Sequence, residues 1–590
     1  MTPWLVGNTT LRNPFRLQES LAVFRDSKFN GSLVTVQEQT EFLELLSDKG
    51  VVKTAFGEHT SFNARKWRSV LYQLGFITQA TASKVDENKR HKLLLDIAAD
   101  VKGISGLAYE LTPNGSRLAD ALVPAEEYDC FLRALAAYQL PSISEPDFQS
   151  TQRFAPLFIV LQILKRLGDA GHDAKVSFEE MASVVMFSQD HATVSLSVDE
   201  IISYRERKHA VPSKRAFDIE YRVEQMANHK VTVQADTLKD YADTNFRYLK
   251  ATGLFVASGR GIKLAPEKVA LAEQLLTGFT LETNDAKYLK RLYNGSSLPS
   301  DSPHEAVAVL ESIAQLLRDA GRVVNLPNLL GKNAEEINQI RFRLESQFSN
   351  VREEAYAADQ KTKWPEILEE LRKLGNRNRY RGAEAPAYLE WAIWRAFLAI
   401  NSLVNKPWEA RRFKVDQDFF PISTAPGNGP DALFEFSDFV IVAEVTFTTN
   451  SRQEAAEGEP VRRHVANEVV NREGTDKEVY GLFIANKIDS NTAETFRHGT
   501  WFKLDDSKLA LSITPLTIEQ FCRVFEAHFN SGQMLPGDVR QVIRDCLVHS
   551  NQEGPLWKQK IAQEIDARVA STTALAAATK GETINNVTHV

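Results

Sequence analysis

Two stretches of the N-terminal half repeat apolar side chains at helical spacing. Residues 63–78 place them at i, i+3, i+4 and i+7, with basic residues opposite, which predicts an amphipathic helix ended by Gly75. Residues 243–253 form a second, shorter helical pattern. Two β runs follow it within residues 254–264 and are joined by a Ser-Gly-Arg-Gly turn, which is typical of a hairpin.

A helix followed by a hairpin is the outline of a winged helix, which places its helix in the major groove and its hairpin over phosphates. The alternative is a small α/β module whose surface charges are only solvated. If the first interpretation holds, the DNA contacts would be Arg65, Lys66 and Arg68 on the first helix, Arg247 and Lys250 on the second, and Arg260 and Lys263 on the hairpin.

The remaining pattern divides the chain further. Residues 154–167 are too apolar for a surface helix and predict a core helix. A serine- and proline-rich stretch at 296–303 is typical of a linker, and strongly helical patterns follow it. We therefore predict a multidomain α/β protein with four parts: two DNA-recognition subdomains at 1–150 and 151–295, a helical linker at 296–376, and a catalytic domain at 377–590.

Composition changes this picture little. The net charge of −7 does not mark a nucleic-acid binder, and basic residues cluster only locally, as in residues 204–215. The sequence has no apolar run long enough for a membrane span and no secretion signal at its start. Three cysteines lie far apart without metal-ligand spacing. We expect a cytoplasmic protein with no membrane contact.

The clearest chemical signal is one acidic residue on an apolar strand. Residues 439–447 are nearly all apolar, as in a buried central strand, and Glu444 interrupts them. Residues 432–436 form the preceding strand, and a tight turn at 437–438 would return Asp431 beside Glu444. Two converging carboxylates are the oxygen ligands that a hard divalent cation needs.

Other charged residues accompany this pair. Glu390 lies on an apolar, aromatic helix, where an unpaired charge is costly. His464 lies on a predicted helix after the strand, and its alternative role is that of an ordinary surface histidine. Glu435 and Asp438 are rival carboxylates, interpreted as a strand-surface and a turn residue. Further strands and helices up to residue 529 predict a mixed sheet flanked by helices.

These residues resemble the PD-(D/E)xK nuclease core. Pro430-Asp431 matches its first element and Glu444-Val445-Thr446 its second, with threonine in place of the usual lysine. Together with the opening WLVGNTTLRNPFR, the segment resembles the AlwI family of type IIS restriction endonucleases, which includes site-specific nicking enzymes. The resemblance implies an N-terminal winged-helix recognition half, a helical linker and a C-terminal nuclease domain.

The resemblance also implies roles for particular residues. The catalytic set would be Glu390, Asp431, Glu444, Glu457 and His464, with one or two Mg²⁺ ions held by Asp431, Glu444, Val445 through its carbonyl, and Glu390. His464 or Arg452 would replace the missing lysine, and Glu457 would orient His464. In the opening segment, Asn8, Arg12 and Arg16 are further candidate DNA contacts.

The predicted function is hydrolysis of double-stranded DNA a few base pairs outside a short asymmetric site. One alternative is a strand-specific nicking enzyme or the large subunit of a heterodimer, because one catalytic domain cuts one strand. A second copy or a small nuclease subunit would then complete double-strand cleavage. A second alternative is a DNA-binding regulator with an inactive nuclease domain. A cognate methyltransferase is expected in the same system.

Overall fold

The computed structural model describes residues 2–52, 60–79, 108–142, 145, 148, 150–376 and 384–587. The chain forms two compact units, Met1–Phe348 and Ser349–Val590. Helix α15 (Ala334–Asp359) crosses the border between them, so the predicted linker at 296–376 straddles both units. The division into four domains stays a prediction.

The first unit begins with a helix–hairpin module. Thr35 caps its second helix in a capping box, and Gly75 ends the third with a φ of +72°, as predicted. Strand β1 pairs antiparallel with β2, and Ser32 bridges to Tyr109 on the other edge of β2. Its elements are α1 (Arg16–Arg25), α2 (Val36–Asp48), α3 (Thr60–Gln73), β1 (Ile77–Gln79), β2 (Tyr109–Leu111), α5 (Pro113–Asp120) and α6 (Pro124–Ala137).

A second module repeats this order of elements. Its three antiparallel strands have the order β3-β5-β4, and Ser258 N donates to Gly261 O across the predicted hairpin turn. The helix predicted at 243–253 is the end of a longer one, α11. The elements are α7 (Pro156–Asp169), β3 (Lys175–Ser177), α8 (Phe178–Ser183), η1 (Val185–Phe187), η2 (His191–Thr193), α9 (Val194–Ala210), α10 (Lys214–Asn228), α11 (Ala235–Ala251), β4 (Phe255–Ala257) and β5 (Gly261–Leu264).

Both modules thus run helix, strand or bridge, helix, helix, hairpin, with α9 and α10 inserted in the second. The apolar helix predicted at 154–167 is α7, and most of its side chains are buried in the core. The unit closes with η3 (Pro266–Lys268), α12 (Val269–Thr277), α13 (Asp285–Asn294), η4 (Pro299–Asp301), α14 (Pro303–Asp319) and the first half of α15.

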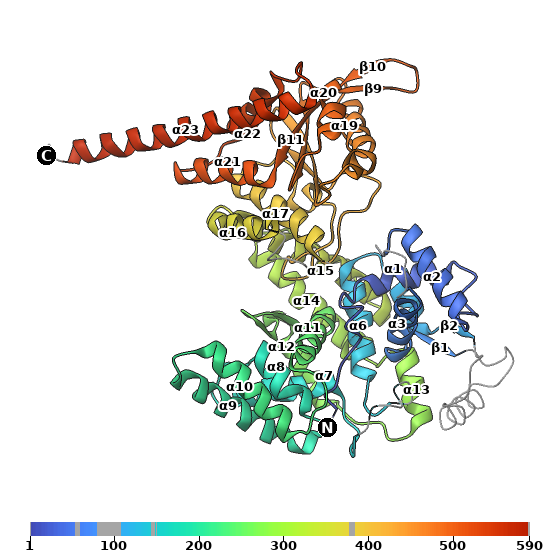
Figure 1. Cartoon of the computed structure of the whole chain (residues 1–590). Coiled ribbons are helices and arrows are strands. Elements are labelled where there is room, and N and C mark those ends of the chain that lie inside the picture. Colours follow the sequence, from blue (N-terminus) through green and yellow to red (C-terminus); the bar gives the residue numbers. More distant parts are fainter. Residues whose placement is uncertain are drawn as a thin grey trace. The chain divides into compact units, whose positions relative to one another are not determined.

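The second unit is built on a four-stranded mixed sheet with the order β11-β8-β7-β6 (Figure 1). Strands β6 and β7 are antiparallel, whereas β7, β8 and β11 are parallel. This confirms the predicted mixed sheet with helices beside it. The elements up to its third strand are α16 (Trp364–Gly375), α17 (Ala385–Ile400), α18 (Pro407–Ala410), β6 (Ala432–Glu435), β7 (Phe439–Thr446), the π-helix η5 (Glu454–Gly458), α19 (Glu459–Asn471) and β8 (Glu478–Ala485).

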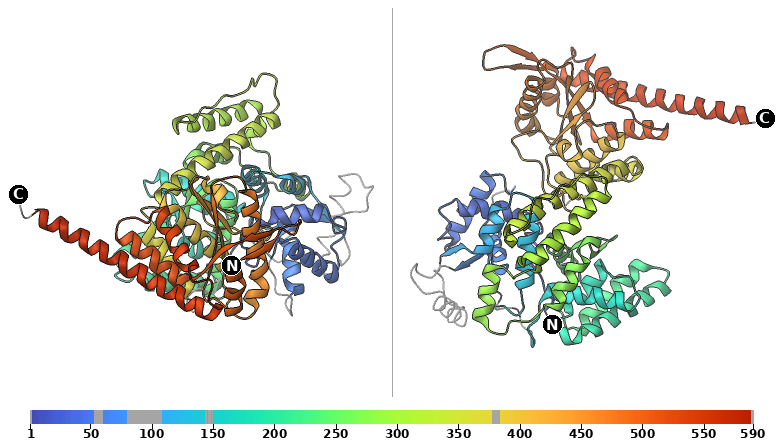
Figure 2. Two further views of the ribbon diagram at one scale, coloured as in Figure 1. Left: turned by 90° about the horizontal axis from the view of Figure 1, so that it is seen from above. Right: turned by 180° about the vertical axis from the view of Figure 1, so that it is seen from behind.

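The rest of the unit completes the helical layers. Its elements are α20 (Ser490–His498), β9 (Thr500–Phe502), β10 (Lys508–Ala510), β11 (Ser512–Thr517), α21 (Ile518–Asn530), α22 (Pro536–Leu547) and α23 (Gly554–Val587). The alanine- and threonine-rich end continues α23, which extends beyond the other helices of its unit (Figure 1 and Figure 2). None of the described helices is long and apolar enough to cross a membrane.

The two faces of this sheet carry different helices. Phe397 of α17 stacks on Phe434 with ring centroids 3.9 Å apart, which covers one face. On the opposite face α19 packs over Gly481, where an added Cβ would lie 2.7 Å from Val465. Because side chains alternate along a strand, Glu444 points to the α19 face together with Val442.

Candidate active site

The β6–β7 hairpin brings Asp431 and Glu444 together. Its register pairs Ala432 with Ala443, so the residues one step further along, Asp431 and Glu444, lie opposite each other. Asp431 Oδ2 accepts a hydrogen bond of 2.8 Å from Val445 N. Glu444 is also hydrogen-bonded by both the backbone and the carboxyl group of Asp431. The predicted meeting of the two carboxyl groups is therefore present in the fold.

The Glu444 carboxyl group is in an unfavourable place for a negative charge. Burial raises its pKa to about 8, and the charge of Glu457 on η5 adds to this rise. The hydrogen bonds from Asp431 and the charge of Arg463 oppose the rise without cancelling it. A buried carboxyl group beside two others would ionise fully only with a cation nearby.

His464 of α19 contacts the same carboxyl group. Its Nδ1 lies 2.5 Å from Glu444 Oε1, and the side chain is buried. The pKa of His464 is lowered to about 4, mainly by burial and also by the charges of Arg463 and Arg412, while the charge of Glu459 opposes the change. The ring is thus neutral near pH 7. Glu444 holds the ring, a role that the sequence interpretation gave to Glu457.

The other ring nitrogen of His464, Nε2, is buried and has no hydrogen-bond partner within the described part of the chain. Orphaned buried ring nitrogens are uncommon and call for an explanation. In a neutral imidazole one nitrogen donates and the other accepts. If Nδ1 donates to Glu444, Nε2 carries a lone pair that can accept a proton.

The remaining predicted site residues lie in three settings. Glu390 is buried on α17, and its Oε2 accepts a hydrogen bond of 2.7 Å from Ala425 N. Arg452 is exposed, and its backbone N donates to Asn450. Thr446, at the motif's lysine position, hydrogen-bonds through its hydroxyl to Thr448 Oγ1 at 3.1 Å, a local contact within the loop.

Both rival carboxylates are held in ion pairs, in agreement with their structural interpretation. Glu435 contacts Arg472 at 3.0 Å and also Lys477. Asp438, in the turn, pairs with Arg540. Their charges are compensated and their pKa values lie below the usual range, because these cations outweigh the effect of burial.

Two arginines to which the sequence interpretation gave no role act on this site. Arg463 precedes His464 on α19 and lowers the pKa of Glu444 by its charge. Arg412 lies in the loop before β6, and its backbone N donates to Asp431 O at 3.3 Å. A search of the sequence for basic residues next to the histidine would have found Arg463. No local pattern would have found Arg412, because only the fold brings it to Asp431.

The donor atoms at this site suit a hard divalent cation. Within the described ranges, no group of three or more His, Cys, Asp or Glu side chains is gathered so that it could hold a metal ion. A site at the hairpin would therefore consist of the Asp431 and Glu444 carboxylates with main-chain and solvent oxygens. The pKa of Glu444 is raised, so this carboxyl group would ionise more readily beside such an ion.

The candidate DNA contacts differ in the ion pairs and ring contacts that their side chains make within the protein. Arg12 Nη2 pairs with Asp240 at 2.6 Å, and Arg247 Nε with Asp243 at 2.9 Å. Arg68 lies over the Tyr109 ring and Arg260 over the Phe178 ring, at 5.0 and 5.5 Å from the centroids.

The other candidates in the first unit make fewer side-chain contacts or are partly buried. The pKa of Lys66 is lowered by burial and by Arg65. Asn8 Oδ1 accepts from Thr10 N, which shapes a turn. The remaining positions are exposed or half-buried, and they are Arg16 at the start of α1, Arg65 on α3, Lys250 on α11 and Lys263 on β5.

The opening segment packs between the two modules of the first unit. Gly7 N donates to Gln73 Oε1 of α3 at 2.9 Å, and Val6 N donates to Asn245 Oδ1 of α11 at 2.8 Å. Gly7 has a φ of +77°, and an added Cβ would lie 2.2 Å from the Tyr248 ring. Part of this distinctive motif therefore joins the helices of both modules.

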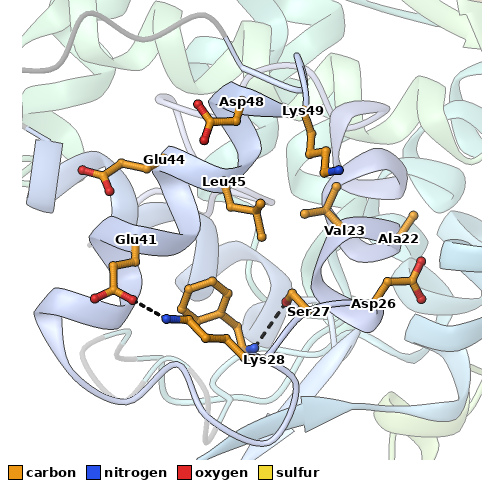
Figure 3. Close-up of a pocket in the computed structure, with 11 residues that line it drawn as sticks. Ala22, Val23, Asp26, Ser27, Lys28, Glu41, Glu44, Leu45, Asp48 and Lys49 are labelled. Atoms are coloured by element: carbon orange, nitrogen blue, oxygen red, sulfur yellow. Dashed lines mark hydrogen bonds and ion pairs between the residues drawn. The ribbon is translucent and has the colours of Figure 1, made fainter.

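A groove of about 680 Å³ lies between α1 and α2 (Figure 3). Glu41, Glu44 and Asp48 line it from α2, and Lys28 is paired with Glu41 at 2.7 Å. An acidic lining repels phosphate groups, so this face of the first module is unsuited to bind DNA.

The mixed sheet with acidic residues at one hairpin is consistent with the restriction endonuclease-like class of folds. The family model of the AlwI restriction endonuclease matches residues 72–524, which is more than half of the chain. The chain belongs to the AlwI restriction endonuclease family, as the sequence resemblance implied.

Comparison with solved structures finds the small subunit (R.BspD6I2) of the heterodimeric restriction endonuclease R.BspD6I. It is 24% identical, the match covers 34% of this chain and 97% of that chain, and the TM-score is 0.28. No curated protein matches the chain.

Proposed function

We propose that this chain is a Mg²⁺-dependent type IIS endonuclease that hydrolyses DNA a few base pairs outside a short asymmetric site. The observation that carries the proposal is the convergence of Asp431, Glu444 and His464 at one end of the β6–β7 hairpin. A buried Glu444 carboxyl group with a raised pKa, next to Asp431, has no evident role in packing, whereas family membership gives it one.

The residues present fit a magnesium site. Asp431, Glu444 and the main-chain carbonyl of Val445 would hold the ion, and Glu390 would serve a second ion where two bind. Bound Mg²⁺ would supply Lewis-acid activation of the phosphate and a more acidic water. This core matches the PD-(D/E)xK pattern with Thr446 in the lysine position.

His464 supplies a base for the reaction. In hydrolysis the water oxygen bonds to phosphorus, one P–O ester bond breaks, and the departing sugar oxygen takes up a proton. The water gives up its own proton, which the Nε2 atom of His464 can accept because Glu444 holds Nδ1.

DNA recognition falls to the first unit. Its two modules share the element order of winged helices, with α3 and α11 each followed by a hairpin. Recognition residues would then lie in one compact unit and the carboxyl pair in the other, joined by α15. Cleavage outside the recognised sequence is the expected result of this division.

The proposal can be tested on supercoiled plasmids that carry varied sequences, incubated with Mg²⁺. We compare wild type with Asp431→Ala and Glu444→Ala, and use Asp505→Ala, an exposed carboxylate in the β9–β10 loop, as the matched control. Wild type and the control should cut, and both site variants should not. Linear product means double-strand cleavage, whereas open circles mean that the enzyme nicks one strand. Intact plasmid with wild type would favour a DNA-binding regulator.

A further inference from the structure

The PD-(D/E)xK-like motif of this chain lacks the lysine that usually carries a positive charge there. Thr446 occupies the lysine position and bonds to Thr448, so β7 offers no cation. Negative charge builds up on the phosphoryl oxygens during hydrolysis, and fixed cations stabilise it strongly. Another element must therefore provide that cation if the chain is an active nuclease.

Most cations near the carboxyl pair are already engaged. Arg463 Nε pairs with Glu459 at 3.0 Å. Arg462 Nε donates to Gly458 O at 3.1 Å, and its guanidinium lies 6.0 Å from the centre of the Trp501 ring. Arg411, next to Arg412, is held by both carboxylate oxygens of Glu353 and by Phe413 O. These contacts hold each guanidinium to the protein.

Arg412 is different from these neighbours. The side chain is exposed, and its guanidinium has no ion pair or hydrogen bond within the described ranges. Its backbone is fixed beside the site, because Arg411 bridges to Ala432 and Arg412 N donates to Asp431 O. An anchored backbone with an unpaired cationic end suits a contact that forms only when substrate binds.

The Arg412 side chain also points toward the loop that ends at Asp431. The guanidinium lies over Gly429, where an added Cβ would be 2.8 Å from its Cζ and Nη2 atoms. Gly429 precedes Asp431 by two residues, so the charge lies over the loop that ends at the carboxyl pair.

We propose that the Arg412 guanidinium, seated over Gly429, contacts the scissile phosphate and replaces the missing lysine of the motif. This inference rests on the proposed nuclease function. It assigns to Gly429 a role as well, since the absence of a side chain there leaves room for the guanidinium. Arg452, the other candidate for this role, follows β7 in the sequence and is exposed. Among the described residues, its hydrogen bond to Asn450 comes from the backbone N and not from the guanidinium.

Plasmid cleavage with enzyme in excess tests the inference. Arg412→Ala should cut about 10²–10³-fold more slowly, the usual loss when one preorganised donor to the transition state is removed. Arg412→Lys should stay within about 10-fold of wild type because it keeps a charge. Gly429→Ala should fall between them, because its Cβ displaces the guanidinium. Arg523→Ala, an exposed arginine paired with Asp566, is the matched control.

Two further measurements separate this role from a structural one. DNA binding with Ca²⁺ in place of Mg²⁺ should weaken by no more than about 5-fold in Arg412→Ala, since one phosphate contact is a small part of the total affinity. Added methylguanidinium should partly restore cleavage by Arg412→Ala and should not restore that of Asp431→Asn. Unfolding midpoints of all variants check that the unit remains folded.

Contrary results would separate the two proposals. If Arg412→Ala cuts at the wild-type rate while Asp431→Asn does not cut, the Arg412 assignment is wrong and the nuclease function stands. Loss of cleavage in Arg452→Ala with a wild-type rate in Arg412→Ala would move the role to Arg452. If wild type itself leaves every plasmid intact, the proposed function fails and the assignment falls with it.

Discussion

The two units each bury acidic side chains, and they treat them in opposite ways. In the first unit Asp129 of α6 accepts hydrogen bonds from Arg133 at 2.7 Å and from Arg341 at 2.8 Å, and Arg133 also pairs with Asp301. Burial alone would raise the pKa of Asp129, but the two arginine charges outweigh it and lower the pKa. Charge is fully compensated there.

In the second unit Asp431 and Glu444 contact each other, and no arginine or lysine is bonded to Glu444 among its described contacts. The pKa of Glu444 rises to about 8 as a result. The difference teaches how to separate architecture from chemistry. A buried carboxylate that is paired with arginines of the protein holds helices together. The buried Glu444 carboxyl group, which faces Asp431, would instead be compensated by a bound cation.

The largest expected effect is on cleavage, through the pair of Asp431 and Glu444. Asp431→Asn keeps an oxygen for the Val445 N–H bond and removes the charge, so cleavage should fall by at least about 10³-fold. Stability should change by less than about 1 kcal/mol, because the amide oxygen of asparagine can still accept the hydrogen bond from Val445 N. Timed plasmid digestion and urea unfolding measure the two quantities. A large loss of stability would show that Asp431 is structural.

The compensated cluster should respond in the reverse way. Asp129→Asn leaves two buried guanidinium groups without their shared acceptor charge, which should cost about 3 kcal/mol of unfolding free energy. Cleavage per folded molecule should stay near the wild-type rate. Urea unfolding followed by fluorescence gives the free energy, with Asp169→Asn, an exposed carboxylate paired with Lys165, as the control. A change below about 1 kcal/mol would remove the distinction between the two clusters.

Glu444 offers a test through pH. Its folded pKa, about 8, exceeds the value of 4.5 expected when unfolded, so the folded state binds the proton more tightly. Its contribution to stability is therefore full below pH 4.5 and is lost as pH rises through about 8. Glu444→Gln cannot ionise, so at pH 8.5 and without divalent cations it should be more stable than wild type by about 2 kcal/mol.

Wild type and Glu444→Gln should have similar stability at pH 5, where the Glu444 carboxyl group of wild type is protonated. Mg²⁺ should narrow the gap at pH 8.5 by stabilising wild type, because an ion that binds only the folded state raises its stability. Thermal unfolding at the two pH values, with and without Mg²⁺, measures both effects. A gap that does not depend on pH would mean that Glu444 is ionised throughout and compensated by a group of the protein.

Local patterns were sufficient for much of the fold. The strands of the β6–β7 hairpin, its turn and the convergence of Asp431 with Glu444 follow from alternation and turn residues within sixteen positions, 431–446. The hairpin after α11 and the end of α3 at Gly75 follow in the same way. These features depend on short-range geometry, which the sequence states directly.

Contacts between distant segments were beyond such patterns. The sequence gives Arg412 no motif, since its relation to Gly429 and His464 depends on the path of a loop. The sequence interpretation also took Glu457 as the partner of His464, because helix spacing cannot show that α19 faces Glu444 on β7. The insertion of α9 and α10 into the second module likewise has no signal of its own.

The smallest expected effect extends the comparison to the surface. Lys263 on β5 is exposed and has no ion pair within the described residues, whereas Arg12 is tied to Asp240 at 2.6 Å. By the same reasoning, the uncompensated charge is the one that can meet a phosphate. Lys263→Ala should weaken binding to all DNA sequences by about 3–5-fold and lower the salt dependence of binding by about one phosphate contact.

Arg12→Ala, by contrast, should leave that salt dependence unchanged, because the arginine must give up its aspartate before it can contact DNA. Titration of labelled duplex at several salt concentrations, in Ca²⁺ to prevent cleavage, measures both slopes. If Arg12→Ala lowers the slope as much as Lys263→Ala does, the ion pair opens on binding. An ion pair in the free protein would then not show whether a surface residue binds DNA. For buried residues the comparison would still separate structural from functional charges.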